Sequence, residues 1–117
     1  MFRVIIAGGR DFDDYELLVK SVDRWLARVR DDICIVCGKA RGADTLGEQY
    51  AKERGYPVHY FPADWKKFGK SAGYIRNTEM AQNADALIAF WDGKSKGTAY
   101  VINRCHKTGK KVTVYKI

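Results

Sequence analysis

Five short apolar segments alternate with four longer amphipathic ones, and this alternation restricts the fold of the chain more than any other feature. The apolar segments cover residues 2–7, 33–37, 57–61, 86–91 and 111–115, and they are typical of buried strands. The segments between them predict helices over about 13–30, 43–54, 72–83 and 98–108. Apolar strands separated by helices predict a parallel sheet that is covered on both faces.

The predicted fold class is α/β, a Rossmann-like doubly wound sheet. Right-handed crossovers favour the strand order 3-2-1-4-5. A chain of 117 residues suits one domain over residues 1–117. Ligands of such sheets bind beyond the carboxyl ends of the strands, here between the first and fourth strands. Residues 62–71 are expected to form a loop, in which Trp65 and Phe68 either pack on the sheet edge or cover the ligand.

Three loops that are rich in glycine or basic residues fall at that edge of the sheet. They contain the sequences GGRDF (residues 8–12), GKARGAD (38–44) and FWDGKSKGT (90–98). Glycines let a backbone approach an anion, helix N-termini offer free N–H groups, and arginine pairs with phosphate. The predicted ligand is therefore a phosphate-bearing molecule, bound by Gly8, Gly9, Arg10, Gly38, Arg41, Gly42, Asp44, Arg76, Asn77, Gly97 and Thr98.

Charge and cysteine content narrow the function further. The net charge of +7 favours anionic partners, although most lysines are expected only to solvate the surface. Cys34 and Cys37 form a CxxC on a predicted strand, where residues three apart point to opposite faces, so we expect reduced thiols and no metal.

No cofactor is predicted. The absence of a membrane span and of a signal segment predicts a cytoplasmic protein, and a homodimer or larger homo-oligomer is left open.

Standard nucleotide motifs are missing from the sequence. Neither GxGxxG nor GxxxxGK[ST] occurs, and no HExxH or GxSxG is present. An ordinary dehydrogenase and a P-loop NTPase are therefore excluded.

Five motifs in order along the chain resemble the YspA-type (cpYpsA-related) branch of the SLOG superfamily, which also contains the LOG phosphoribohydrolases and the DprA proteins. They are GGRDF, GKARGAD, PADWKKFGKSAG (residues 62–73), IRNTEM (75–80) and ADALIAFWDGKSKGT (84–98). The resemblance implies a Rossmann-like domain that binds nucleotides or nucleotide-derived molecules.

The resemblance to the LOG enzymes bears on catalysis. Arg76, Gly97 and Thr98 resemble elements of the LOG motifs, but Val101 occupies the position of the catalytic glutamate. We therefore expect a binding protein with a sensor, carrier or sequestering role, in which no catalytic residue is assigned. Two alternatives stay open: a nucleotide N-glycosidic hydrolase whose carboxylate is supplied by Asp44, Glu79 or Asp92, and a protein that binds single-stranded nucleic acid.

Overall fold

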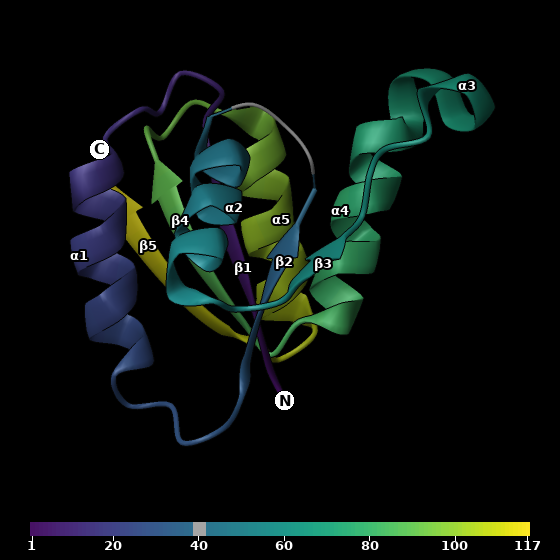
Figure 1. Ribbon diagram of the computed structural model, residues 1–117. Coiled ribbons are helices and arrows are strands. Elements are labelled where there is room, and N and C mark those ends of the chain that lie inside the picture. The colour runs from purple at the N-terminus through teal and green to yellow at the C-terminus, as the bar shows by residue number, and fades with distance from the viewer. Residues whose placement is uncertain (39–41) are drawn as a thin grey trace.

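The computed structural model describes residues 1–38 and 42–117, and within them the strands form one parallel sheet in the order β3-β2-β1-β4-β5 (Figure 1). The predicted α/β fold class and strand order are confirmed. The strands are β1 (Phe2–Gly8), β2 (Ile33–Cys37), β3 (Val58–Tyr60), β4 (Ala86–Trp91) and β5 (Lys111–Lys116). The helices are α1 (Tyr15–Leu26), α2 (Ala43–Arg54), α3 (Trp65–Phe68), α4 (Ala72–Asn83) and α5 (Lys96–Lys107), with a 3-10 turn η1 (Gly69–Ser71) after α3.

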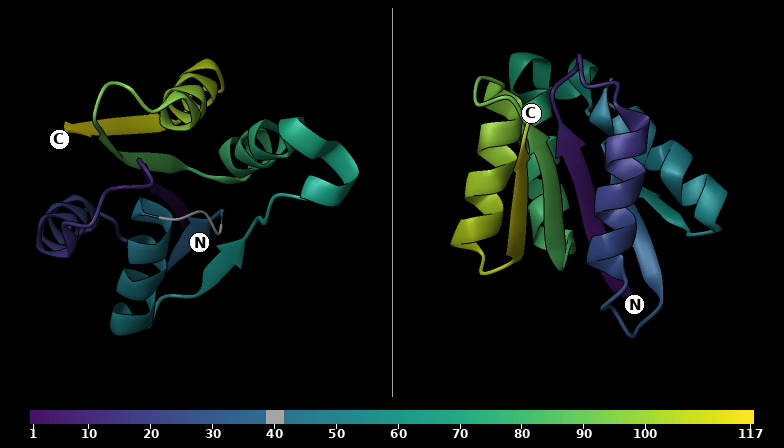
Figure 2. Two further views of the ribbon diagram at one scale, coloured as in Figure 1. Left: turned by 90° about the horizontal axis from the view of Figure 1, so that it is seen from above. Right: turned by 90° about the vertical axis from the view of Figure 1, so that its left-hand side faces the viewer.

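Helices cover both faces of the sheet and enclose two apolar clusters. Figure 2 shows α1 and α2 on one face and α4 and α5 on the other. Successive residues of β1 serve the two faces in turn, because side chains alternate along a strand. Val4 and Ile6 pack in the cluster beneath α1 and α2, whereas Ile5 packs with Val101 and Cys105 beneath α4 and α5.

Three helix predictions need correction. Helix α1 ends at Leu26 rather than near residue 30: Val29 keeps the apolar spacing and packs on the core, but it does so from outside the helix. Helix α5 begins at Lys96, two residues before the predicted start at residue 98, because Ser95 is its N-cap. The expected loop over residues 62–71 contains α3, which Asp64 caps by accepting the N–H of Lys67 at 3.1 Å.

The short helix α3 projects from the body of the molecule (Figures 1 and 2). Trp65 is 55% exposed and Phe68 is 39% exposed. Neither side chain lines the cavity described below. The structure therefore supports neither the expected packing on the sheet edge nor a cover over a ligand.

Cys34, Cys37 and Cys105 are all buried free thiols. Cys37 donates from Sγ to the carbonyl of Asp44 at 3.7 Å. Burial raises the pKa of Cys34, and it raises the pKa of Cys105 to about 11, so both stay protonated at neutral pH. Among the described residues, every helix is too short or too polar to cross a bilayer.

Candidate functional site

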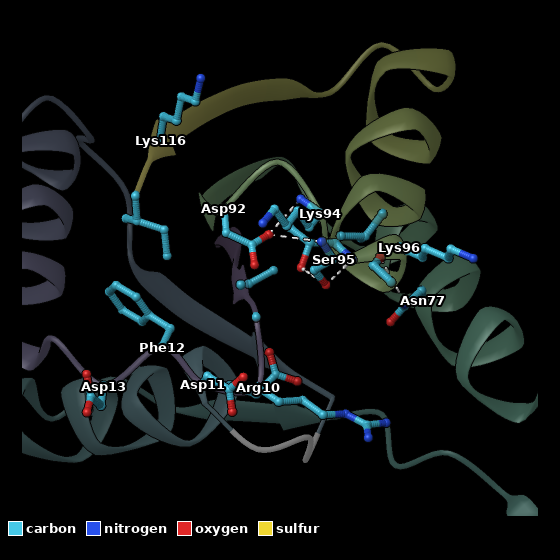
Figure 3. A pocket seen from close by; sticks show the side chains of 18 of the residues that line it. Arg10, Asp11, Phe12, Asp13, Asn77, Asp92, Lys94, Ser95, Lys96 and Lys116 are labelled. Carbon is cyan, nitrogen blue, oxygen red and sulfur yellow. Dashed lines mark hydrogen bonds between the residues drawn. The ribbon is translucent and has the colours of Figure 1, made fainter.

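A cavity of about 970 Å³ opens at the carboxyl ends of β1 and β4 (Figure 3). This is the switch point of the strand order, where a parallel sheet of this kind leaves a crevice. Three segments supply most of its wall: residues 7–14 at and after the end of β1, Asp92 with residues 94–98 before and in the first turn of α5, and Arg76, Asn77 and Met80 on α4. Asp44, Leu17, Val101 and the last two residues of the chain complete it.

The segment after β1 is held in place by tight packing. Gly8 has no room for a side chain, since a Cβ there would lie 2.6 Å from the carbonyl oxygen of Phe90 and 2.8 Å from the Cβ of Ala43. The chain then turns, with the N–H of Phe12 donating to the carbonyl of Gly9 at 3.2 Å. Phe12 is buried and stacks on Phe90 with ring centroids 5.0 Å apart. The loop is thereby fixed to the core, while the exposed side chain of Arg10 lines the cavity.

The loop after β4 is organised by Asp92 and Ser95. Oδ1 of Asp92 accepts the N–H groups of Lys94 and Ser95 at 2.8 and 2.9 Å, and these backbone bonds hold the pKa of Asp92 below its usual value. Ser95 caps α5: its Oγ accepts the N–H of Thr98 at 3.4 Å and lies 3.0 Å from Oγ1 of Thr98. Thr98 therefore has its amide and hydroxyl engaged. The N–H groups of Lys96 and Gly97, which also open α5, have no acceptor in the part of the chain that the structure describes.

Helix α4 bridges the two sides of the cavity. Nη1 of Arg76 donates to the carbonyl of Gly38, in the loop after β2. Its buried Nε has no partner among the described residues. Asn77, the next residue, donates from Nδ2 to the carbonyl of Gly97 at 3.5 Å. Arg76 and Asn77 thus connect α4 to the loop after β2 and to the first turn of α5.

Two of the predicted glycines shape the cavity without lining it. A Cβ at Gly38 would lie 2.9 Å from Nη1 of Arg76 and 3.0 Å from Oδ2 of Asp44, so its missing side chain lets both groups approach the same point. Gly42 has φ of 76° and ψ of −125°, a conformation that glycine alone adopts readily. A side chain there would collide with the backbone of Gly9 and Arg10.

The other predicted site residues are placed as follows. Arg41 lies outside the described residues. The structure brings the remaining predicted residues to one cavity wall: Gly8, Gly9, Arg10, Asp44, Arg76, Asn77, Gly97 and Thr98. That they bind a ligand stays a prediction. The sequence argument missed Asp11, Phe12, Asp13, Lys94, Ser95 and Lys96, which line the cavity and adjoin the predicted residues in the same two loops.

The cavity carries both signs of charge. Carboxylates come from the loop after β1, from Asp44 and from Asp92, and cations come from Arg10, Arg76 and three lysines. In Figure 3 the carboxylate of Asp92 points toward the loop after β1, whereas Lys96 and Lys116 extend outward at the rim. Within residues 1–38 and 42–117, no three His, Cys, Asp or Glu residues gather as they would around a metal ion.

The three carboxylates considered for catalysis differ in position. Asp44 and Asp92 line the cavity, but Glu79 is exposed and absent from its wall. Val101 is 3% exposed and contributes to the wall as well as to the core beneath α4 and α5. The position that resembles the LOG glutamate is thus an apolar part of the cavity.

Comparison with known proteins gives a family match and two structural neighbours. The family model described as YspA, cpYpsA-related SLOG matches residues 2–68. "Gene 61 protein" of Mycobacterium phage D29 is 35% identical over 115 residues, covering 93% of this chain and 92% of that protein. DNA processing protein A (DprA) from Streptococcus pneumoniae superposes with a TM-score of 0.74 at 17% identity; the match covers 97% of this chain and 49% of that chain, so this chain spans about half of DprA. The protein TM1055 superposes with a TM-score of 0.68 at 21% identity over 96% of this chain and 72% of that one. At these identities the two neighbours establish the fold.

Proposed function

The chain belongs to the YspA, cpYpsA-related SLOG family, and we propose that its cavity binds a nucleotide or a nucleotide-derived molecule in a sensor, carrier or sequestering role. A volume of about 970 Å³ is within the range of small-molecule and cofactor sites. Its position at the switch point of a doubly wound sheet is where such folds bind ligands.

One observation carries the proposal: the first turn of α5 lies on the cavity wall and presents two backbone N–H groups that no described residue accepts. The N–H groups of Lys96 and Gly97 have no acceptor among the described residues, and the helix dipole adds positive potential there. Gly97 and Gly9, on opposite sides of the cavity, have nothing within 4 Å of where a Cβ would be, so a phosphate could approach either backbone closely. Lys94 and Lys96 line the same part of the cavity wall as Gly97.

The carboxylates of the cavity indicate which groups the ligand would carry beside its phosphate. Asp92 is held ionised by its two backbone hydrogen bonds, so it accepts hydrogen bonds and repels phosphate. Asp44 lies beside Arg76 at the loop after β2. We expect ribose hydroxyls or base amino groups to donate to these carboxylates while the phosphate lies at α5. A ligand with a phosphate at one end and several donors at the other fits this distribution of charge.

Gly97→Glu tests the assignment. The new carboxylate would occupy the space in front of the α5 amides, where the helix dipole tolerates an acid and the fold keeps its stability. Like-charge repulsion should weaken the best nucleotide by about 2 kcal/mol or more. Calorimetry with AMP, ADP, ATP, cyclic AMP, ADP-ribose and their guanosine counterparts measures this, and Gly97→Ala is the matched control because it adds Cβ without charge. Equal affinity in both variants would remove the phosphate from α5, and no binding across the panel would reject the proposal.

A second candidate function, a LOG-type hydrolase with a relocated carboxylate, is favoured by Asp44 and Asp92 on the cavity wall. An oxocarbenium-like transition state needs such a group, and the lowered pKa of Asp92 suits it to stabilise a cation rather than to donate a proton. The two functions are distinguished by incubating the protein with AMP, CMP, GMP or UMP and analysing the mixture for free base by chromatography. We expect no free base. Base release that Asp44→Asn or Asp92→Asn abolishes would make the protein an enzyme.

A further inference from the structure

A second hollow of about 760 Å³ lies between the last turn of α1 and the edge strand β5. Its wall holds four cations, Arg24, Arg28, Arg30 and Lys111, and all four are exposed. None of them forms an ion pair with a carboxylate among residues 1–38 and 42–117. We call this feature the basic hollow. Like charges that gather without acidic partners create a local positive potential that attracts anions.

The floor of the basic hollow is aromatic. It contains Phe2, Trp25 and Tyr115, each half-buried. Trp25 is fixed there, because its Nε1 donates to Oγ1 of Thr113 at 2.9 Å and its ring lies 5.8 Å from that of Phe2. The hollow therefore combines charged groups at its rim with an ordered apolar surface beneath them.

Among the described residues, one acidic side chain lines the basic hollow, and it already forms an ion pair. Asp31 forms an ion pair with the α-amino group of Met1 at 3.1 Å. This differs from the cavity, where carboxylates and cations are mixed. A small ligand that carries both hydrogen-bond donors and acceptors is bound by acidic and basic side chains together. A polyanion is attracted by cationic side chains and repelled by carboxylates.

We propose that the basic hollow binds single-stranded nucleic acid, with the four cations on successive phosphates and the aromatic floor against the sugars and bases. Basic grooves with aromatic side chains bind single strands in this way, because the bases of a single strand are free to contact an apolar surface. The inference does not depend on what the cavity binds.

The hollow also lies along a path that a strand could follow. Helix α1 contributes Leu17 to the cavity and Arg24 to the hollow, about 10 Å apart at the rise of an α-helix. At the end of β5, Tyr115 lines the hollow and Ile117, two residues later and so on the same side, lines the cavity. An extended polymer, unlike a single nucleotide, could contact the whole of this α1–β5 side.

The test is fluorescence anisotropy with a labelled 20-nucleotide oligothymidylate and the full chain. If four phosphates are neutralised, the logarithm of affinity should fall with the logarithm of salt at a slope of about −3, or about fiftyfold weaker binding from 50 to 200 mM salt. The double variant Arg24→Gln with Arg28→Gln should bind at least tenfold more weakly at 50 mM salt, with a slope shallower by about 1.4. A duplex of the same length should bind more weakly than the single strand.

The matched control is Lys66→Gln with Lys67→Gln, which removes the same charge from α3, where exposed Trp65 and Phe68 form the rival surface for a strand. This variant should leave the affinity within threefold of wild type. If the arginine variant fails to fold by circular dichroism, Arg30→Gln with Lys111→Gln replaces it. The inference is overturned by no binding at 50 mM salt, by an unchanged slope in the hollow variant, by an equal loss in the α3 variant, or by equal affinity for duplex.

Discussion

The cavity and the basic hollow lie at opposite ends of α1 and are built differently. The cavity is formed largely by loops whose glycines leave backbone open to close approach, and its lining includes acidic and basic side chains. The hollow is formed by regular elements, α1 and β5, with long cationic side chains at its rim. Among the described residues that line them, the hollow has four cationic side chains to one acidic side chain, whereas the cavity has five of each. A mixed set of charges suits a ligand that carries both donors and acceptors, and an excess of cations suits a polyanion.

The largest effect should come from Gly42→Ala, which breaks the cavity and spares the hollow. Gly42 has φ of 76°, and a Cβ would collide with the backbone of Gly9 and Arg10. Strain and overpacking together should lower the free energy of unfolding by about 3 kcal/mol. Nucleotide affinity should be lost because the loop after β1 must move, whereas oligothymidylate affinity should persist at a temperature where the variant is folded.

Gly55→Ala is the matched control for this substitution. Gly55 also has a positive φ, of 73°, but nothing lies within 4 Å of its Cβ position. Its cost should be only the left-handed conformation, about 1 kcal/mol. Urea unfolding measures both variants. Equal stabilities would show that the close approach at Gly42 is easily relieved and that the loop is not held as described.

Arg76→Ala should act on the cavity with a smaller effect. Loss of a charge-assisted hydrogen bond should weaken nucleotide binding by about 1.5–3 kcal/mol. Loss of the bond from Arg76 to the carbonyl of Gly38 should also lower the free energy of unfolding by about 1 kcal/mol. Calorimetry and urea unfolding separate the two quantities.

Arg104→Ala controls for the loss of a half-buried arginine. Like Arg76, Arg104 has a buried Nε without a partner among the described residues, but it does not line the cavity. Its variant should change stability and leave nucleotide affinity alone. An equal loss of affinity in both variants would mean that Arg76 acts through the fold rather than at the ligand.

The elements that sequence predicted well are those with clear ends. Helix α2 was predicted at its observed bounds because Gly55 terminates it in the left-handed conformation. The sequence pattern places the start of α5 at Thr98, because glycine at position 97 is typical of a loop, whereas the structure places the start at Lys96, where Ser95 caps the first turn. Helix α3 was missed because four residues carry no periodicity; only Asp64, a capping residue before an apolar position, could have indicated it.

The candidate site was predictable from position and the hollow was not. Any residue that follows a parallel strand reaches the same edge of the sheet, so Gly9 and Arg10 after β1 and Gly97 after β4 could be placed together without coordinates. Arg24 and Lys111 have no such rule: one is on a helix face and the other begins an edge strand. Only the packing of α1 against β5 brings these two residues around one hollow. The CxxC and the glycine-rich motifs of the sequence do not indicate the hollow.

The smallest effect should come from Asp31→Asn, which sharpens the claim that acids oppose binding in the hollow. Asp31 is the carboxylate that lines it, and its hydrogen bond with the α-amino group of Met1 holds its pKa below the usual value. The group is therefore ionised at neutral pH. Its removal should raise oligothymidylate affinity about two- to threefold, as expected for one screened surface charge.

Asp32→Asn is the control, since Asp32 is exposed and adjacent in sequence but does not line the hollow. Because the pKa is lowered, the difference from wild type should persist as pH falls and vanish only below that lowered pKa, where wild type also loses the charge. Anisotropy titrations at 50 mM salt measure the effect, and equal gains in both variants would mean that net charge, rather than the hollow, sets the affinity.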